Sequence, residues 1–426
     1  MHKDVQVFLA NFLQLGFLRG ISRVSSLITI PFLMRTIGIE KYGTIQFVVA
    51  LSFYFTAFIS YGFRYSATKQ VVLHKQDKAT IGQLLGAVYT IKLAAVGVTL
   101  IIGGLLIFFV PSIQQVKGYL LCFFPVLVAS TLFPTFIFQG LGKMQWMTLL
   151  NLLAKLLFLT GVFTLIRSPS DALLYPILLA AADILRLAVA FYLVYHNLGV
   201  AIRLPPRAMI YSQLKEGLPI FLSHLSVTFY TRLPMIFLSF FVGPSSVAIY
   251  ALGDKVARTT LGMVDPFTQA LFPIASRKMT ESQRESFWFL GRVAVVSMAI
   301  LLIIGTCYWL FATSIIRLLA GKLIQDAVWI LKLHAFLPCI VILSNIFGMG
   351  VLVPAGAGKK YLMTMLMTGL LCVGLHFVLV PQLQAQGAAW AILLCEAFAT
   401  VMMLLWALQT IVLLLRQRPG KDTDAS

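Results

Sequence analysis

The feature that most constrains the fold is a series of long apolar runs separated by short charged stretches. A helix needs about 20 apolar residues to cross the hydrocarbon core of a bilayer. Runs of this kind predict twelve spans, approximately at residues 10–34, 43–66, 82–110, 118–139, 146–166, 172–196, 216–241, 247–272, 288–312, 327–352, 361–381 and 387–414. With 60% hydrophobic residues, the chain is expected to be an all-α polytopic membrane protein.

The loops between the runs predict the orientation. With the N-terminus inside, most loop lysines and arginines lie on the cytoplasmic side, as in segments 67–81 and 197–215. The positive-inside rule therefore predicts that both termini are cytoplasmic. It also explains the net charge of +19 without a nucleic-acid partner. The first run contains arginines and has no small-residue cleavage site, so it is interpreted as a retained span.

The two halves of the chain echo each other. Residues 37–44, after the first span, are similar to residues 242–249, after the seventh, and residues 140–143 are similar to residues 356–359. Each pair links span n to span n+6, which predicts two six-helix lobes with the same orientation around a central cavity. The predicted division is an N-lobe over 1–200, a cytoplasmic linker over 201–215 and a C-lobe over 216–426.

Charged residues inside the spans are the candidate functional groups, because each is costly to place in lipid. The N-lobe has five deep cations against one acid, a net of +4, namely Arg19, Arg23, Lys92, Lys155 and Arg186 against Asp183. The C-lobe is balanced, with Arg232, Lys255 and Arg258 against Asp254, Asp265 and Glu396. Internal pairing is an alternative for Asp183 with Arg186 and for Asp254 with Arg258, which lie one helical turn apart.

Arg19 and Arg23 lie four residues apart and share one face of the first span. That face should turn away from lipid, toward a solvated cavity that holds an anionic, phosphate-bearing substrate. The predicted substrate-binding set is Arg19, Arg23, Lys92, Lys155, Arg232, Lys255 and Arg258. For Lys92 and Lys155, pairing with a carboxylate or reaching the interface are equal alternatives.

Acids of the C-lobe are candidates for binding a coupling ion, because a carboxylate in a low-dielectric site can take up and release a proton. Asp265 and Glu396 have no basic residue three or four positions away, and Asp254 is a third candidate. His224 is a fourth candidate, since histidine titrates near neutrality. Structural ion pairs, or for His224 a simple hydrogen bond, are the alternatives.

The sequence has none of the motifs of the common enzymes. It contains no phosphate-binding loop, nucleophile elbow or metal-ligand cluster, and its five cysteines lie within apolar runs. We therefore expect neither an enzyme nor a metal or organic cofactor. The expected energy source is a proton or sodium gradient.

Several segments resemble one family, the polysaccharide repeat-unit flippases (Wzx or RfbX type) of the multidrug/oligosaccharidyl-lipid/polysaccharide exporter superfamily. The matching segments are residues 38–43, 61–69, 133–140, 250–255, 344–348 and 352–354. The resemblance runs over nearly the whole chain. Members often have asparagine where this chain has Arg64, which leaves the role of Arg64 open.

The resemblance implies a flippase that moves undecaprenyl-diphosphate-linked oligosaccharide repeat units, such as O-antigen, across the bacterial inner membrane by alternating access. It places Arg19 and Arg23 in the span where related flippases carry cavity arginines for the pyrophosphate. Membrane lipids, a polysaccharide polymerase and a chain-length regulator are the implied partners. Two alternatives stay open: a small-molecule cation antiporter of the same superfamily, and a membrane-embedded polysaccharide polymerase or ligase.

Overall fold

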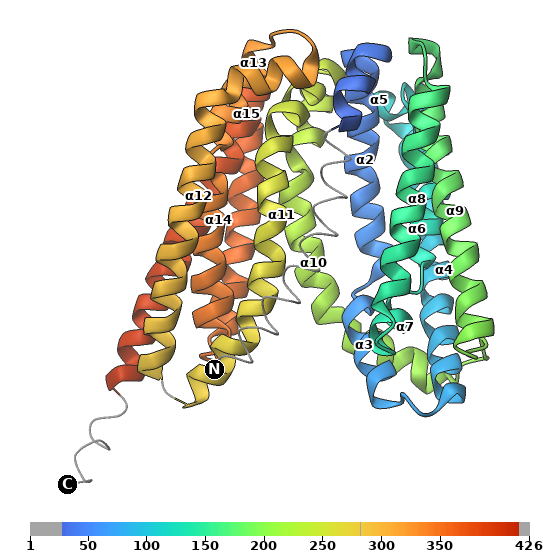
Figure 1. Cartoon of the computed structure of the whole chain (residues 1–426), viewed down its shortest axis with the longest axis vertical. Helices are drawn as coiled ribbons and strands as arrows, with labels where there is room; N and C mark the ends of the chain where they lie inside the picture. The colour runs from blue at the N-terminus through green and yellow to red at the C-terminus, as the bar shows by residue number, and fades with distance from the viewer. Residues whose placement is uncertain (1–27, 282, 417–426) are drawn as a thin grey trace. The chain divides into compact units, whose positions relative to one another are not determined.

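The computed structural model of the chain describes residues 28–281 and 283–416, and these are almost entirely helical (Figure 1). Residues 1–27, 282 and 417–426 lie outside the described part. Of the first predicted span, a helix over residues 28–36 is described. No strand occurs among the described residues, so the all-α prediction is confirmed.

The first compact unit comprises Phe32–Ala248. Its helices are α2 (Ile39–Ser60), α3 (Phe63–Leu73), α4 (Lys78–Phe109), α5 (Pro111–Gln114), α6 (Lys117–Leu132), α7 (Thr135–Gly140), α8 (Met144–Leu165), η1 (Pro169–Leu173), α9 (Leu174–Tyr192), η2 (Leu193–Asn197) and α10 (Arg207–Phe241). Within this unit α6 and α8 pack on α9, and α10 packs on α2, α3 and α4.

The second compact unit comprises, among the described residues, 28–31 and 249–416. Its helices are α11 (Pro244–Glu281), which begins in the first unit, α12 (Gln283–Ala320), α13 (Gln325–His334), α14 (Leu337–Asn345), η3 (Ile346–Leu352) and α15 (Gly358–Arg416). In Figure 1, α12, α14 and α15 run alongside one another from orange to red. The compact units meet in the sequence at Ala248, whereas the predicted lobes are separated by the linker over 201–215. The predicted lobe boundaries therefore stay a prediction.

Eight described helical segments are long and apolar enough to cross a membrane. The last of them, Gly358–Leu414, covers two predicted spans. The two spans are separated at Gln384, where φ 50° and ψ −127° interrupt the helix α15. α10 and α11 also coincide with predicted spans but are not among the eight, and the segment Val227–Phe241 of α10 is apolar but shorter.

Large apolar side chains cover the outer faces of several helices. Phe108 on α4 is 77% exposed and Val295 on α12 is 70% exposed, and similar residues continue along both helices. Helices of this length with exposed apolar faces are suited to contact with lipid and not with water. The chain is therefore a multi-pass membrane protein.

The first sequence echo has a structural counterpart. Gly38 precedes α2 with φ 85° and Gly243 precedes α11 with φ 122°, backbone conformations that glycine adopts at little cost. The two segments also meet, because a Cβ added to Gly43 would lie 1.8 Å from the carbonyl oxygen of Pro244. In the second echo the positive φ falls at Gly142 in one copy and at Gly356 in the other, which are not aligned positions.

The turn between α3 and α4 is fixed by a helix cap. Asp77 accepts hydrogen bonds from the backbone N–H groups of Ala79 (2.9 Å) and Thr80 (3.1 Å) and from the Thr80 hydroxyl. These bonds satisfy donors that the first turn of α4 leaves unpaired. They also hold the pKa of the exposed Asp77 carboxyl below its usual value, with the Thr80 hydroxyl as the largest cause.

Candidate functional site

Four of the predicted functional residues lie where the structure does not describe their side chains. Arg19 and Arg23 are outside the described residues altogether. His224 and Asp265 fall within the helices α10 and α11, but their side chains are outside the described part. Their predicted roles stay predictions.

Lys92 is a buried cation next to a broken helix. α6 ends at Leu132 and α7 begins at Thr135, because Pro134 has no N–H to continue the helix. Lys92 Nζ donates to the Thr131 carbonyl at 2.5 Å, and the Tyr89 hydroxyl, one turn away on α4, donates to the Leu132 carbonyl at 2.7 Å. These contacts satisfy carbonyl groups that the break leaves without helical partners. The geometry gives Lys92 a structural role, while its predicted contact with substrate stays a prediction.

A Lys92→Met substitution is expected to lower thermal stability without changing the affinity of the folded protein for substrate. The Thr131 carbonyl would be buried without a donor, which costs about 1–3 kcal/mol, and the loss of a buried charge offsets part of this. Tyr89→Phe is a matched variant with no change in charge. Thermal unfolding in detergent measures the first effect and lipid binding the second. Reduced affinity at unchanged stability would instead assign Lys92 to the substrate.

Arg186 is held by neighbours from two helices. It forms an ion pair with Asp183 on α9 (3.2 Å), as the spacing predicts, and its Nη1 donates to Asn151 Oδ1 on α8 (2.9 Å). The guanidinium also lies 4.7 Å from the ring centroid of Phe133, at the break after α6. Arg186 therefore joins α8 and α9 to the broken helix.

Arg232 and Lys155 are half-buried cations of the first unit. The Arg232 guanidinium on α10 lies 3.7 Å from the ring centroid of Phe53 on α2, a cation–π contact. Beside it the Tyr54 hydroxyl donates to the Phe229 carbonyl at 2.8 Å. Lys155 lies on α8. The substrate contacts predicted for both cations stay predictions.

The second unit contains a buried charged cluster that joins three helices. Asp254 on α11 accepts a hydrogen bond from Arg258 Nε, so the predicted pair is confirmed. The other carboxylate oxygen lies 2.9 Å from Nδ1 of His334 on α13. Nε2 of the same ring lies 3.1 Å from the Ala389 carbonyl on α15. Sequence reasoning missed His334, because its partners are 80 and 55 residues away and no local spacing reveals them.

Lys255 and Glu396, the remaining candidates, are half-buried on α11 and α15. The backbone carbonyl of Glu396 accepts a bond from the Thr400 hydroxyl (2.8 Å). Their proposed roles in substrate and ion binding stay predictions. No group of three potential metal-ligating side chains occurs among the described residues.

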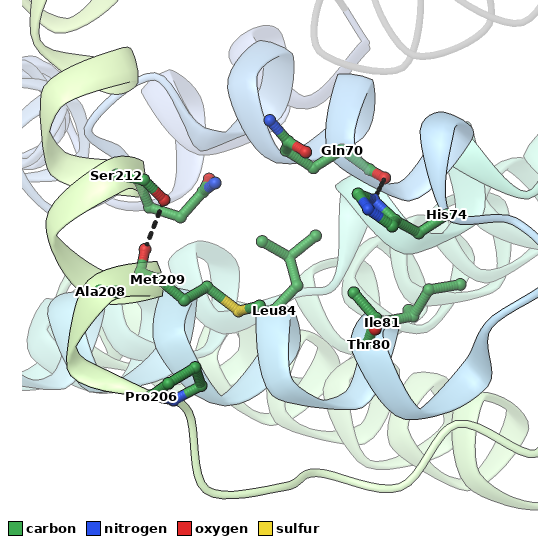
Figure 2. Close-up of a pocket in the computed structure, with 10 residues that line it drawn as sticks. Gln70, His74, Thr80, Ile81, Leu84, Pro206, Ala208, Met209 and Ser212 are labelled. Atoms are coloured by element: carbon green, nitrogen blue, oxygen red, sulfur yellow. Dashed lines mark hydrogen bonds between the residues drawn. The ribbon is translucent and has the colours of Figure 1, made fainter.

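A pocket of about 410 Å³ lies in the first unit, where α3, α4 and the start of α10 meet (Figure 2). Most of its lining is apolar, with Ile81, Leu84 and Met209 among the residues that face it. Gln213, also in the lining, is 2% exposed, and its Oε1 has no hydrogen-bond partner within the described structure. None of the ten lining residues is a lysine or an arginine, so this pocket lacks the cations that a pyrophosphate needs.

The sequence matches a known protein family. A profile of the polysaccharide biosynthesis protein family matches residues 8–279, well over half of the sequence. The chain belongs to this family. The resemblance found in the sequence segments is thereby confirmed, and the matched range includes Arg19 and Arg23.

Two relatives are similar over nearly their full lengths. A protein of Escherichia coli (strain K12), provisionally named an O-antigen transporter, is 26% identical over 93% of this chain and 95% of its own length. A protein of Shigella dysenteriae with the same provisional name is 24% identical over 94% of this chain and 99% of its own.

Solved structures share the fold. The lipid II flippase MurJ in an inward closed conformation has a TM-score of 0.72 at 13% identity, covering 96% of this chain and 94% of its own. An inward-facing multidrug resistance MATE family transporter of the MOP superfamily has a TM-score of 0.68 at 16% identity, covering 94% and 100%. The predicted fold class of about twelve transmembrane helices is therefore confirmed.

Proposed function

We propose that this protein is a flippase for lipid-linked oligosaccharides of a surface polysaccharide such as O-antigen. The observation that carries the proposal is the similarity to two proteins named as O-antigen transporters over more than nine-tenths of each chain. Both relatives are named as transporters, and the chain is a membrane transporter and not an enzyme. The fold shared with a lipid II flippase supports a substrate that carries a sugar on a lipid.

The proposed substrate is an undecaprenyl-diphosphate-linked repeat unit, moved from the cytoplasmic to the periplasmic leaflet of the bacterial inner membrane. Arg19 and Arg23 are proposed to hold the pyrophosphate, because arginine forks bind phosphate oxygens through paired hydrogen bonds. Alternating access, coupling to an ion gradient and cytoplasmic termini are parts of the same proposal. A polymerase and a chain-length regulator are the proposed partners downstream.

The two alternatives receive less support. A cation antiporter requires acids that are available to an organic cation. Asp254 has the lowest exposure of the deep acids among the described residues, and it is bonded to Arg258 and His334. A polymerase or ligase requires a sizeable extramembrane domain for donor and acceptor. The longest predicted loop covers only residues 197–215.

Deleting the gene in a bacterium that makes a repeat-unit polysaccharide tests the proposal. Surface polymer should disappear, and unpolymerised lipid-linked units should accumulate on the cytoplasmic face. A plasmid copy of the gene should restore the polymer. Normal polymer in a deletion strain that has no second flippase would refute the proposed function.

A further inference from the structure

Both ring nitrogens of His334 face oxygen atoms. Nδ1 lies 2.9 Å from the Asp254 carboxylate, and Nε2 lies 3.1 Å from the backbone carbonyl of Ala389. The His334 and Asp254 side chains are 0% and 1% exposed, so neither is in contact with bulk solvent. A neutral imidazole has one N–H donor and one acceptor nitrogen, and it cannot donate to two oxygens.

The hydrogen bonds therefore require an additional proton. A backbone carbonyl only accepts, so Nε2 must carry a hydrogen in the contact with Ala389. The contact with Asp254 then needs a second hydrogen, on Nδ1 or on the carboxyl. Arg258 donates to the other carboxylate oxygen and stabilises the ionised form of Asp254. The extra proton is thus assigned to His334, which becomes an imidazolium.

The charges of Arg258 and Asp254 next to His334 allow this proton to exchange. With His334 charged, two cations, Arg258 and His334, face the single carboxylate of Asp254, and the His334 and Asp254 side chains are almost fully buried. An excess positive charge on buried side chains is costly, so the pair can release the proton when its surroundings change.

Among the described residues, other titratable groups near the pair lie on α11, α12, α13 and α15. Tyr250 on α11 is fully buried and sets its ring edge-on to His334, with centroids 6.1 Å apart, and Cys372 on α15 interacts with Tyr250. On α12 the Tyr308 hydroxyl is bonded to Thr260 of α11 (2.9 Å). Lys332, on α13 itself, extends over the Trp309 ring of α12 at 4.9 Å.

Glu396 is another acid of the second unit and lies on α15, where it interacts with Cys372 and Tyr361. His376, also on α15, is bonded through Nδ1 to the Cys372 carbonyl (2.7 Å). Asp254 is the acid that the structure places in hydrogen-bond contact with His334.

The proton also holds helices together. With it, His334 on α13 bonds to α11 through Asp254 and to the part of α15 after Gln384 through Ala389. Without it, the Nδ1 lone pair would face a carboxylate, or the ring would give up the Ala389 bond. The packing of α11, α13 and α15 within the second unit therefore depends on whether the pair is protonated.

We propose that Asp254 and His334 together form a proton-binding site, and that its loading and release provide the coupling step of transport. The second part rests on the proposed flippase function. The first part is a statement about hydrogen bonding in the second unit and is independent of the substrate. Under the second part of the proposal, the proton is the coupling ion and His334 carries it.

The first test uses nuclear magnetic resonance of the full chain in nanodiscs, with ¹⁵N-labelled histidine. The other five histidines are replaced by asparagine, so that His334 is observed without being altered. Both ring nitrogens should be protonated at neutral pH, and one proton should leave as the pH rises. A single neutral tautomer from about pH 5 to about pH 8 would overturn the proposal. If this variant does not fold, the difference between wild-type and His334→Asn spectra gives the same reading.

The second test separates the coupling from the proposed substrate. Vesicles containing the protein and an undecaprenyl-diphosphate oligosaccharide are assayed for lipid movement with and without an imposed pH gradient. The gradient should accelerate movement by wild type and by the exposed control His196→Asn, but not by His334→Asn. An unchanged gradient response in His334→Asn would overturn the coupling role. Absence of movement in every protein, with a protonated His334 in the first test, would instead refute the flippase function.

Discussion

A Gly43→Ala substitution is expected to remove most of the folded protein from the membrane. The new methyl group would lie 1.8 Å from the Pro244 carbonyl oxygen and 2.6 Å from its carbon, both of them backbone atoms. Side chains can rotate away from such an overlap, but a helix backbone must shift as a whole. The cost should reach or exceed the upper end of the roughly 1–3 kcal/mol that overpacking usually causes.

Gly97→Ala is the matched control, because Gly97 also lies within a helix and an added Cβ would meet no atom within 4 Å. Replacing a helical glycine with alanine there should be neutral or stabilise by up to about 1 kcal/mol. Size-exclusion profiles and thermal unfolding in detergent measure both variants. Equal yields and unfolding temperatures for the two proteins would show that α2 and the start of α11 do not make this close contact.

Replacing Arg19 and Arg23 together with glutamine is expected to abolish transport while the protein still inserts into the membrane. Glutamine keeps hydrogen-bonding capacity but removes the two positive charges proposed to hold the pyrophosphate. Charge-assisted bonds are about twice as strong as neutral ones, so the loss of two should be decisive. The readout is restoration of surface polysaccharide in a deletion strain, with the amount of membrane protein measured by immunoblot.

The control for this pair is Arg416→Gln with Arg418→Gln, which removes two arginines near the C-terminus and should leave complementation intact. A double lysine variant at positions 19 and 23 should restore part of the activity, because it returns charge without the bidentate geometry. Full complementation by the double glutamine variant would remove both arginines from the proposed pyrophosphate site.

The fold was largely predictable because membrane helices are encoded locally. The long described helices from α2 onward coincide with apolar runs, and the break in α15 at Gln384 falls between two predicted spans. The pairs Asp183 with Arg186 and Asp254 with Arg258 were also predictable, since both partners lie on one helix within a single turn.

The candidate sites were less predictable, because their contacts join distant parts of the chain. Lys92 meets a carbonyl 39 residues away, and nothing in its own span indicates that partner. Pro134 was the available signal, since a proline within a helix leaves carbonyl groups that need a donor elsewhere. His334 carried no comparable signal, because a histidine in an apolar run is compatible with many roles.

Movement of a sugar-bearing lipid across the bilayer can be measured in vesicles containing the purified protein. A fluorescent undecaprenyl-diphosphate oligosaccharide is distributed over both leaflets, and a membrane-impermeant quencher is added outside. With the protein present, fluorescence from the inner leaflet should also be lost, whereas vesicles without protein should keep it. Persistence of the inner-leaflet signal in vesicles that contain folded protein, with and without an ion gradient, would contradict the proposed flippase function.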